Sequence, residues 1–236
     1  MKNLIEVFKD TLNTSMKKNN GVTTIHTNDE IKQISHKYHF NGNIKVINLD
    51  SVSALTEYSK YGKTCVLNMA SYKRPGGGVR NGAMAQEECL FRCSNLINSI
   101  PNTFYPLEDN ECLYTKDAVF FKDFNYNYID DVICDVITIA AINLNVVKQD
   151  SNYRGITLDK IRLMLTLPAK NGVKNIILGA FGCGVFKNDP NIISEFFREV
   201  LIEEGYSSLY ENVIFAVIND HNSVRNNYNS FLKKFQ

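Results

Sequence analysis

The amino-acid sequence predicts an α/β fold in which helices cover a mixed β-sheet on both faces. Three observations support this prediction. Runs with strand character alternate along the chain with runs of helical period. Several of the strand-like runs are apolar at successive positions, which is typical of strands buried on both faces. Two glycine clusters each separate such a strand from a helix, which is where open α/β sheets bind ligands.

The chain is expected to form one domain over residues 1–236. Its 236 residues can bury a substantial core, and no linker, repeat or low-complexity segment divides them. A net charge of +1 excludes a bulk field that would attract nucleic acid or a membrane. No run approaches the roughly 20 apolar residues of a membrane span, and the N-terminus lacks the apolar centre of a signal peptide. We therefore expect a cytoplasmic protein, or a nuclear one in a eukaryotic host, with no membrane partner, and we expect it to be a monomer.

The elements of the first hundred residues follow from apolar spacing and from capping residues. The helix over 51–62 is expected to begin at Asp50 or Ser51 and to stop at Gly62. In order, we expect an amphipathic helix over 1–18 with Leu4, Val7, Phe8 and Leu12 on one face, strands over 21–27 and 43–50, the helix over 51–62, a strand over 63–71, and a helix from Gln86 to Pro101 with Leu90, Cys93, Leu96, Ile97 and Ile100 on one face.

The remaining elements continue the alternation of strands and helices. The segment 111–143 is expected to form two or three strands, with a polar, tyrosine-rich connection near 123–131. Pro168 weakens the end of the helix that follows. After these strands we expect a helix over 157–171, a strand over 175–181, a helix from about Asp189 to Glu204, a strand over 212–220 and a closing helix over 223–235.

Each glycine cluster could close backbone N–H groups around an anion, helped by the positive end of the following helix. The first cluster is Gly76–Gly78 in "KRPGGGVRNGAMAQEE", and the second comprises Gly179, Gly182 and Gly184 in "GAFGCGVF". Tight turns that require a positive φ are the structural alternative. Two clusters, both at strand ends, favour a ligand that carries phosphate.

Neither cluster matches a familiar nucleotide-binding motif. The GxxxxGK[ST] pattern of P-loop NTPases is missing, and neither cluster reads GxGxxG. A nicotinamide-dependent oxidoreductase therefore stays an alternative that would require a bound dinucleotide. The histidines and cysteines lack the spacing of a zinc site, so we expect no metal and six reduced thiols.

Two adjacent carboxylates, Glu87 and Glu88, stand at the expected start of a helix soon after the first cluster. Acidic residues there complement the helix dipole by about 0.3–1 kcal/mol each, and Glu88 could pair with Arg92 one turn later. The nearby glycine loop favours a chemical role instead. Cleavage of a riboside bond develops oxocarbenium character and needs a carboxylic acid to protonate the departing oxygen. The other carboxylate could hold a ribose hydroxyl and, by its charge, raise its neighbour's proton affinity.

The stretch over 67–96 resembles poly(ADP-ribose) glycohydrolases, in which GGG is followed by six to eight residues and then QEE. Here seven residues separate Gly76–Gly78 from Gln86-Glu87-Glu88. The segments "FYPLEDNECLYTKDAVFFKDF", "VITIAAIN" and "LGAFGCGVFKNDP" are similar, in the same order, to the compact microbial type of this family. The resemblance runs from about residue 5 to residue 220. It implies a three-layer, macrodomain-like fold, with a mixed sheet sandwiched between helices and ADP-ribose in a cleft at the strand ends.

The resemblance also implies residue roles. Glu88 is implied to be the general acid, and Glu87 to bind a ribose hydroxyl. Asn68 is implied to shape the distal ribose pocket, although a turn-forming role is as consistent with its position. Asp50 falls where macrodomains contact adenine, and helix capping explains it equally well. The other implied substrate-binding residues are Gly76, Gly77, Gly78 and Val79 beside the distal ribose and diphosphate, Gln86 of the motif, Gly182, Cys183, Gly184, Val185 and Phe186 in the diphosphate loop, and Asn219 on the adenine side.

The implied activity is hydrolysis of ribose–ribose O-glycosidic bonds in poly(ADP-ribose), without a cofactor. The expected partners are ADP-ribose or poly(ADP-ribose) as substrate and ADP-ribosylated proteins. The sequence departs from the family pattern at Met69, Ile142 and Phe181; all three are apolar and bear on substrate preference. Removal of single ADP-ribose units from protein or nucleic acid, and binding of ADP-ribose without cleavage, remain alternatives.

Overall fold

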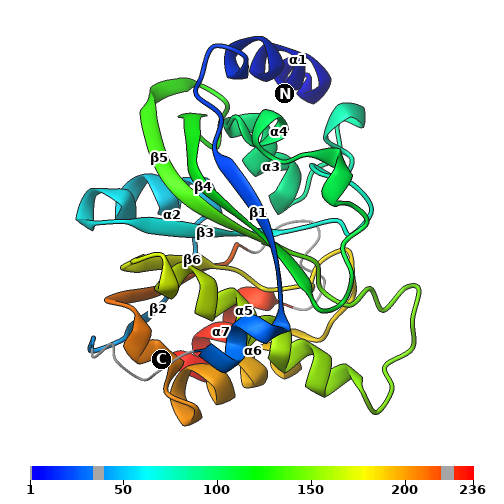
Figure 1. The fold of residues 1–236 in the computed structure, drawn as a ribbon, viewed down its shortest axis with the longest axis vertical. Coiled ribbons are helices and arrows are strands. Elements are labelled where there is room, and N and C mark those ends of the chain that lie inside the picture. The colour runs from blue at the N-terminus through cyan, green and yellow to red at the C-terminus, as the bar shows by residue number, and fades with distance from the viewer. Residues whose placement is uncertain (1, 34–39, 219–225) are drawn as a thin grey trace.

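The computed structural model describes residues 2–33, 40–218 and 226–236, and this part of the chain contains one seven-stranded sheet with helices on both sides (Figure 1). The strands are β1 (Val22–Thr27), β2 (Asn43–Ile47), β3 (Thr64–Met69), β4 (Glu111–Lys122), β5 (Tyr128–Ile139), β6 (Asn175–Leu178) and β7 (Asn212–Ala216). The α-helices are α1 (Leu4–Ser15), α2 (Ser51–Tyr58), α3 (Gln86–Cys93), α4 (Leu96–Ser99), α5 (Tyr153–Lys170), α6 (Pro190–Arg198) and α7 (Asn227–Phe235).

The sheet is mixed, as the sequence predicts. Its strand order is β1-β4-β5-β3-β6-β7-β2. Strands β1, β4 and β5 pair antiparallel, whereas β5, β3, β6, β7 and β2 pair parallel. The carboxyl ends of these five parallel strands therefore meet at one edge of the sheet, and loops that follow them lie close together.

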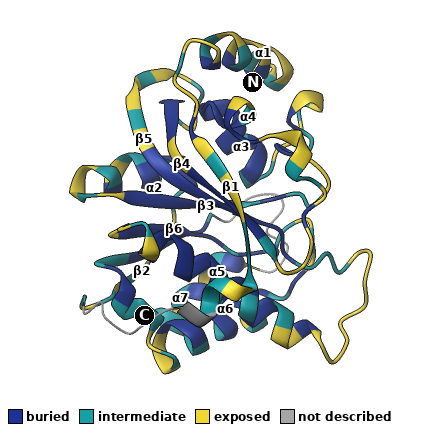
Figure 2. Ribbon diagram, viewed as in Figure 1, coloured by how far each residue is buried: buried dark blue, intermediate teal, exposed yellow. Residues whose placement is uncertain are grey.

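Both faces of the sheet are buried, which makes three layers. Successive side chains of a strand point to opposite faces. In β3, Cys65 and Leu67 pack in the core formed with α5, α6 and α7, whereas Val66 packs in the core formed with α1, α2, α3 and α4. Figure 2 shows β3 and β6 buried and the exposed residues gathered in loops and on the outer sides of helices. Burial on both faces explains the continuous apolar runs in the sequence.

The expected helix from Gln86 to Pro101 is wrong in one respect, because the structure divides it into α3 and α4. Ser94 has an extended backbone (φ −143°, ψ 178°) and forms an isolated bridge with Phe120 of β4. The backbone N–H of Asn95 donates to the carbonyl of Val119, and the Asn95 side-chain oxygen accepts from the Val119 N–H. Pairing with β4 thus interrupts a segment whose apolar spacing is helical throughout.

Other expected boundaries differ by a few residues. Asp50, and not Ser51, caps α2, because its carboxylate accepts the N–H groups of Val52 and Ser53. The segment 111–143 contains two strands, β4 and β5, joined as an antiparallel pair. Helix α5 begins four residues before the expected start, and a π-helical turn over Glu199–Glu203 extends α6.

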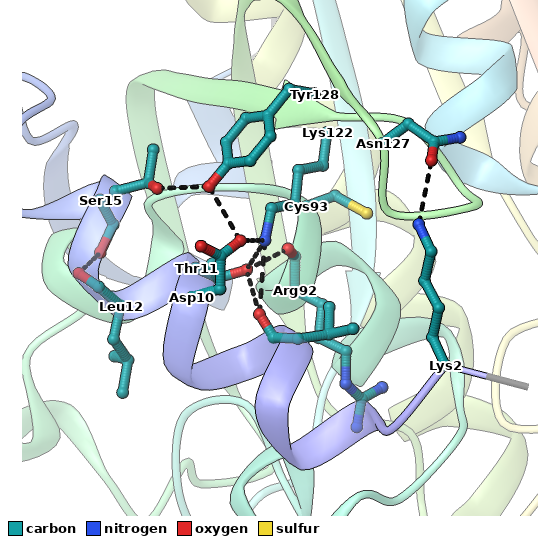
Figure 3. Close-up of polar contacts among 12 residues, drawn as sticks. Lys2, Asp10, Thr11, Leu12, Ser15, Arg92, Cys93, Lys122, Asn127 and Tyr128 are labelled. Atoms are coloured by element: carbon teal, nitrogen blue, oxygen red, sulfur yellow. Dashed lines mark hydrogen bonds and ion pairs between the residues drawn. The ribbon is translucent and has the colours of Figure 1, made fainter.

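Helix α1 is joined to α3 and to the β4–β5 pair by a polar cluster around the buried ammonium of Lys122 (Figure 3). The Lys122 ammonium, 1% exposed, donates to the Asp10 carboxylate at 2.7 Å and to the Thr11 hydroxyl at 2.9 Å. The Thr11 hydroxyl donates to the carbonyl of Arg92 in α3 at 2.6 Å. Its bond to Lys122 lowers the pKa of Asp10, which keeps the pair charged. The cluster fixes α3, the helix whose first turn contains the two glutamates.

Within the described ranges, no helix has both the length and the apolar character needed to cross a membrane.

Candidate active site

The main cavity lies at the edge of the sheet where the parallel strands end. Its volume is about 310 Å³, within the range of small-molecule sites. Loops that follow β2, β3, β5, β6 and β7 all contribute to its lining, together with the first turns of α2, α3 and α7. The topology therefore gathers here segments that lie far apart in the sequence.

Gln86 fixes the start of α3 against the end of β3. Its side-chain oxygen accepts the Met69 N–H at 3.0 Å, and its amide group donates to the carbonyl of Leu67 at 2.6 Å and to the hydroxyl of Ser51 at 3.1 Å. These bonds set the direction of the first helical turn. The next two residues, Glu87 and Glu88, are placed by it.

Glu87 lies almost entirely inside the protein, with 3% of its surface exposed. One carboxylate oxygen accepts the Ser71 N–H at 2.7 Å, and the other accepts the Gly76 N–H at 3.1 Å and the Asn68 amide at 3.4 Å. Burial, together with the charge of Glu88, nevertheless raises the pKa of Glu87 to about 8, since these bonds only partly replace water.

Glu88 is 7% exposed and has fewer protein partners than Glu87. Each of its oxygens accepts one backbone N–H, from Gly78 at 2.9 Å and from Ala85 at 3.0 Å. The alternative pairing of Glu88 with Arg92 is wrong. The Arg92 guanidinium turns away and donates to the carbonyls of Leu4, Val79 and Ala83, so it holds the loop and not the carboxylate.

The two carboxylates converge on Gly77. An added Cβ at this residue would lie 2.6 Å from a Glu88 oxygen and 3.0 Å from a Glu87 oxygen. The φ of Gly77 is also +52°, a value that side chains with a Cβ rarely adopt. The N–H groups of Gly76 and Gly78 donate to the carboxylates of Glu87 and Glu88, so the first glycine loop positions the two acids. These two N–H groups are therefore not available to bind a ligand anion, contrary to the expectation from the sequence.

The proton of the carboxylate pair resides on a different residue from the one expected. The sequence suggests that one glutamate raises the proton affinity of the other, with Glu88 as the acid. In the structure it is Glu87 whose pKa rises, first because it is the more deeply buried of the two and then because of the charge on Glu88. At neutral pH Glu87 therefore carries a proton.

The second glycine loop presents free N–H groups. Among described residues, no acceptor bonds the backbone N–H of Gly184, Val185 or Phe186. All three residues line the main cavity. Three successive unpaired N–H groups beside a cavity are donors that an anion could accept. The positive end of α6 does not add to it, because the Asp189 carboxylate already caps that helix.

The side chain of Asn188 holds this loop in shape. It is 1% exposed, its amide donates to the carbonyls of Ile142 and Gly182, and its oxygen accepts the Tyr153 hydroxyl at 2.7 Å. At Gly182, φ is +73° and an added Cβ would lie 2.5 Å from the Asn188 amide. By contrast, an added Cβ at Gly184 would meet nothing within 4 Å, so packing does not require glycine there.

The expected site residues divide into two groups. Those that line the main cavity are Asp50, Gln86, Glu87, Glu88, Gly182, Gly184, Val185 and Phe186. Those described residues that do not line it are Asn68, Gly76, Gly77, Gly78, Val79 and Cys183. Asn68 lies behind Glu87, and Val79 and Cys183 are core residues, 1% and 5% exposed. Asn219 lies outside the described residues.

Sequence reasoning missed much of the lining of the main cavity, including three large side chains, and one residue that supports it. Met84, Phe124 and Tyr126 line the main cavity, and Asn188 supports its second loop. Phe124 and Tyr126 belong to the tyrosine-rich connection that the sequence indicates only as a polar turn. An aromatic pair in a turn between two strands is the signal that could have found them.

The described residues include no group of three or more histidine, cysteine, aspartate or glutamate side chains arranged to hold a metal ion. The six cysteines are free, and Cys89 alone among them is not buried.

Comparison with known proteins gives a family and a set of similar structures. A family model described as the microbial-type PARG catalytic domain matches residues 6–124. The chain is similar to the structure of poly(ADP-ribose) glycohydrolase (PARG) from Thermomonospora curvata, with 21% identity over 98% of this chain and 99% of that chain and a TM-score of 0.86. A structure of PARG from Deinococcus radiodurans in complex with ADP-ribose is 27% identical, covers 91% of this chain and 94% of that chain, and has a TM-score of 0.81. No curated protein matches the sequence.

Proposed function

The chain belongs to the microbial-type PARG family, and we propose that it cleaves ribose–ribose O-glycosidic bonds in poly(ADP-ribose), releasing ADP-ribose, by means of Glu87 and Glu88. It is a glycosidase of the macrodomain-like fold. The observation that carries the mechanism is the convergence of the two carboxylates on Gly77, at the edge of a cavity whose opposite loop offers three unpaired N–H groups.

Glu88 is the proton donor in this proposal. It is the more exposed of the two, and each of its oxygens has a single protein donor, which leaves room for a substrate oxygen. Its proton passes to the departing ribose oxygen as the bond from that oxygen to the anomeric carbon breaks. Water then adds to the oxocarbenium-like anomeric carbon, and the proton that water loses returns to the carboxylate pair.

Glu87 supplies the proton before the reaction and orients the sugar during it. Its raised pKa keeps one proton on the pair at neutral pH. A ribose hydroxyl that donates to Glu87 favours its ionised form, so the proton moves to Glu88 when the substrate is bound. Removing either carboxyl group therefore removes the acid, although the two residues have different roles.

The second loop binds the diphosphate in this proposal. The unpaired N–H groups of Gly184, Val185 and Phe186 favour a doubly charged ligand, such as the diphosphate of ADP-ribose. The solved D. radiodurans protein binds ADP-ribose, which supports the assignment. Asp50 has one oxygen bonded by two backbone N–H groups and the other by the Ser53 hydroxyl, which leaves a lone pair that can accept the adenine amino group.

The decisive experiment measures ADP-ribose release from poly(ADP-ribose) by wild type and by Glu88→Gln, which removes the acidic proton and nearly preserves shape. We expect a loss of at least about 100-fold in kcat, the usual contribution of a general acid. Glu57→Gln, an exposed carboxylate outside the main cavity, is the control. Equal rates for wild type and Glu88→Gln would eliminate the proposed role.

Two further arms separate the alternatives. A protein carrying single ADP-ribose units tests whether the same acid releases monomeric modifications. Calorimetry with ADP-ribose tests for a reader, which would bind it tightly without turnover of polymer and without dependence on Glu88. The buried carboxylate pair has no purpose in a reader, and we therefore expect turnover.

A further inference from the structure

A second cavity lies behind the first glycine loop, and we call it the loop cavity. It has a volume of about 210 Å³ and is lined by Arg74, Pro75, Gly77–Asn81, Ile97 and Asn102. Two of its lining residues also contact the proposed acid. The Gly78 N–H donates to a Glu88 oxygen at 2.9 Å, and an added Cβ on Gly77 would lie 2.6 Å from the same oxygen. Gly77 and Gly78 therefore adjoin both the loop cavity and Glu88.

The rim of the loop cavity is basic and has no acidic neighbour in sequence. The segment 71–85 contains Lys73, Arg74 and Arg80 and no aspartate or glutamate. All three basic side chains are exposed, and within the described residues none forms an ion pair with a carboxylate. The two arginines line the cavity, and Arg80 is held over the ring of Phe8, 5.7 Å from its centroid.

Unpaired arginines around a hollow favour an anion of the phosphate class. A guanidinium matches phosphate oxygens with two parallel N–H bonds, and Asn81 and Asn102 on the same lining add neutral donors. Lys73 and Arg80 each lie over an aromatic ring, but among the described residues no carboxylate balances the three positive charges, which repel one another when no anion is bound. The chemistry of the rim therefore points to a pyrophosphate or a phosphodiester.

The identity of the anion at the loop cavity follows from the proposed function, on which this inference rests. In poly(ADP-ribose) the departing oxygen belongs to the ribose of an adjoining ADP-ribose unit, and that unit carries its own pyrophosphate. Gly77 and Gly78 contact Glu88, the proposed donor to the departing oxygen, and they also line the loop cavity, so a unit joined to that oxygen can extend over the glycine loop toward Arg74 and Arg80. We propose that the loop cavity is a subsite that binds the pyrophosphate of the unit on the leaving side of the cleaved bond, and that it makes the enzyme prefer polymer to single ADP-ribose groups.

Two substrates isolate the subsite. One is poly(ADP-ribose) of defined length. The other is an ADP-ribose whose anomeric oxygen carries a 4-nitrophenyl group, which occupies the main cavity in the same way and has no leaving-side pyrophosphate. The measured quantity is the ratio of kcat/KM for the polymer to kcat/KM for the nitrophenyl substrate. The variants are Arg74→Gln, Arg80→Gln and their combination, with thermal unfolding to check the fold.

Controls use the chain's own residues. Lys60→Gln removes an exposed positive charge near the amino end of β3, at the opposite edge of the sheet from the site. Arg74→Lys keeps the charge and removes the two-pronged donor. Arg74 makes no aromatic contact of the kind Arg80 makes with Phe8, so its single variant reports on the subsite even if Arg80→Gln loosens α1.

The double variant is expected to lower the ratio about tenfold, from two lost charge-assisted contacts at an exposed site, and to weaken the salt dependence of polymer KM. Lys60→Gln should leave the ratio unchanged, and Arg74→Lys should give an intermediate value.

A ratio that stays at the wild-type value in the double variant, while both substrates are still hydrolysed, would overturn the subsite. If wild type cleaved neither substrate, the proposed function would fail and the subsite with it. If a single-stranded oligonucleotide inhibited both substrates equally, and the double variant relieved this inhibition with an unchanged ratio, the rim would bind nucleic acid and the subsite would also be rejected.

Discussion

The buried carboxyl group of Glu87 is expected to make the free energy of unfolding depend on pH, and the substitution Glu87→Gln is expected to remove most of that dependence. Burial raises the pKa of Glu87 from its ordinary value of 4.5 to about 8. Between these values the folded protein keeps a proton that the unfolded chain has released, so the free energy of unfolding falls as pH rises. Each pH unit in this window corresponds to about 1.4 kcal/mol, which gives a loss of up to about 5 kcal/mol between pH 4.5 and pH 8.

The amide also has an effect that does not depend on pH. Glu87 accepts N–H groups from Ser71, Gly76 and Asn68 with its two oxygens. Glutamine has one acceptor oxygen, so its NH₂ group would face a donor and at least one buried bond would be lost, at about 1–3 kcal/mol. The variant should therefore be less stable than wild type at pH 5 and more stable than wild type at pH 9.

Urea unfolding followed by far-UV circular dichroism, at five pH values from 5 to 9, measures this crossing. Titration of groups remote from Glu87 is shared by the two proteins and cancels in the difference. Glu57→Gln, at an exposed site, controls for the loss of one carboxylate charge. A stability difference between Glu87→Gln and wild type that is equal at pH 5 and at pH 9 would refute the argument from burial.

Four more outcomes follow from the site. In pH profiles of kcat/KM, activity should fall as pH rises above about 8, since the carboxylate pair then loses its proton; an unchanged rate at pH 10 would contradict this. Gly77→Ala should reduce kcat by at least about 100-fold, because its Cβ would displace both carboxylates, and a crystal structure of the variant should show them apart. Gly184→Ala should keep the wild-type melting temperature, as its Cβ meets no protein atom within 4 Å, yet weaken ADP-ribose binding measured by calorimetry; a lowered melting temperature would count against the assigned role. Asn188→Ala should lower the free energy of unfolding by about 2–4 kcal/mol, since it removes bonds to Ile142 and Gly182, and denaturant unfolding measures that loss.

Much of the fold could be predicted because the signals are local. A strand buried on both faces must be apolar at successive positions, and β3 and β6 are recognisable for that reason. The glycine clusters and the pair of glutamates are also recognisable in the sequence, and their position after strands already places them at one edge of the sheet. Where the prediction failed, at Ser94 and Asn95, a distant strand decided the backbone: β4 offers bonds to this segment that its helical spacing cannot reveal.

What the sequence determined by itself is which residues approach one another: two glycine loops and two carboxylates beside an α/β cleft. The tertiary structure alone decided which groups are paired and how deeply each is buried. It assigned the N–H groups of the first loop to the carboxylates and left those of the second loop free, and it raised the pKa of Glu87. The physical reason is that proton affinity and unsatisfied hydrogen bonds depend on the exclusion of water by packed neighbours from the whole chain, and no local pattern contains that information.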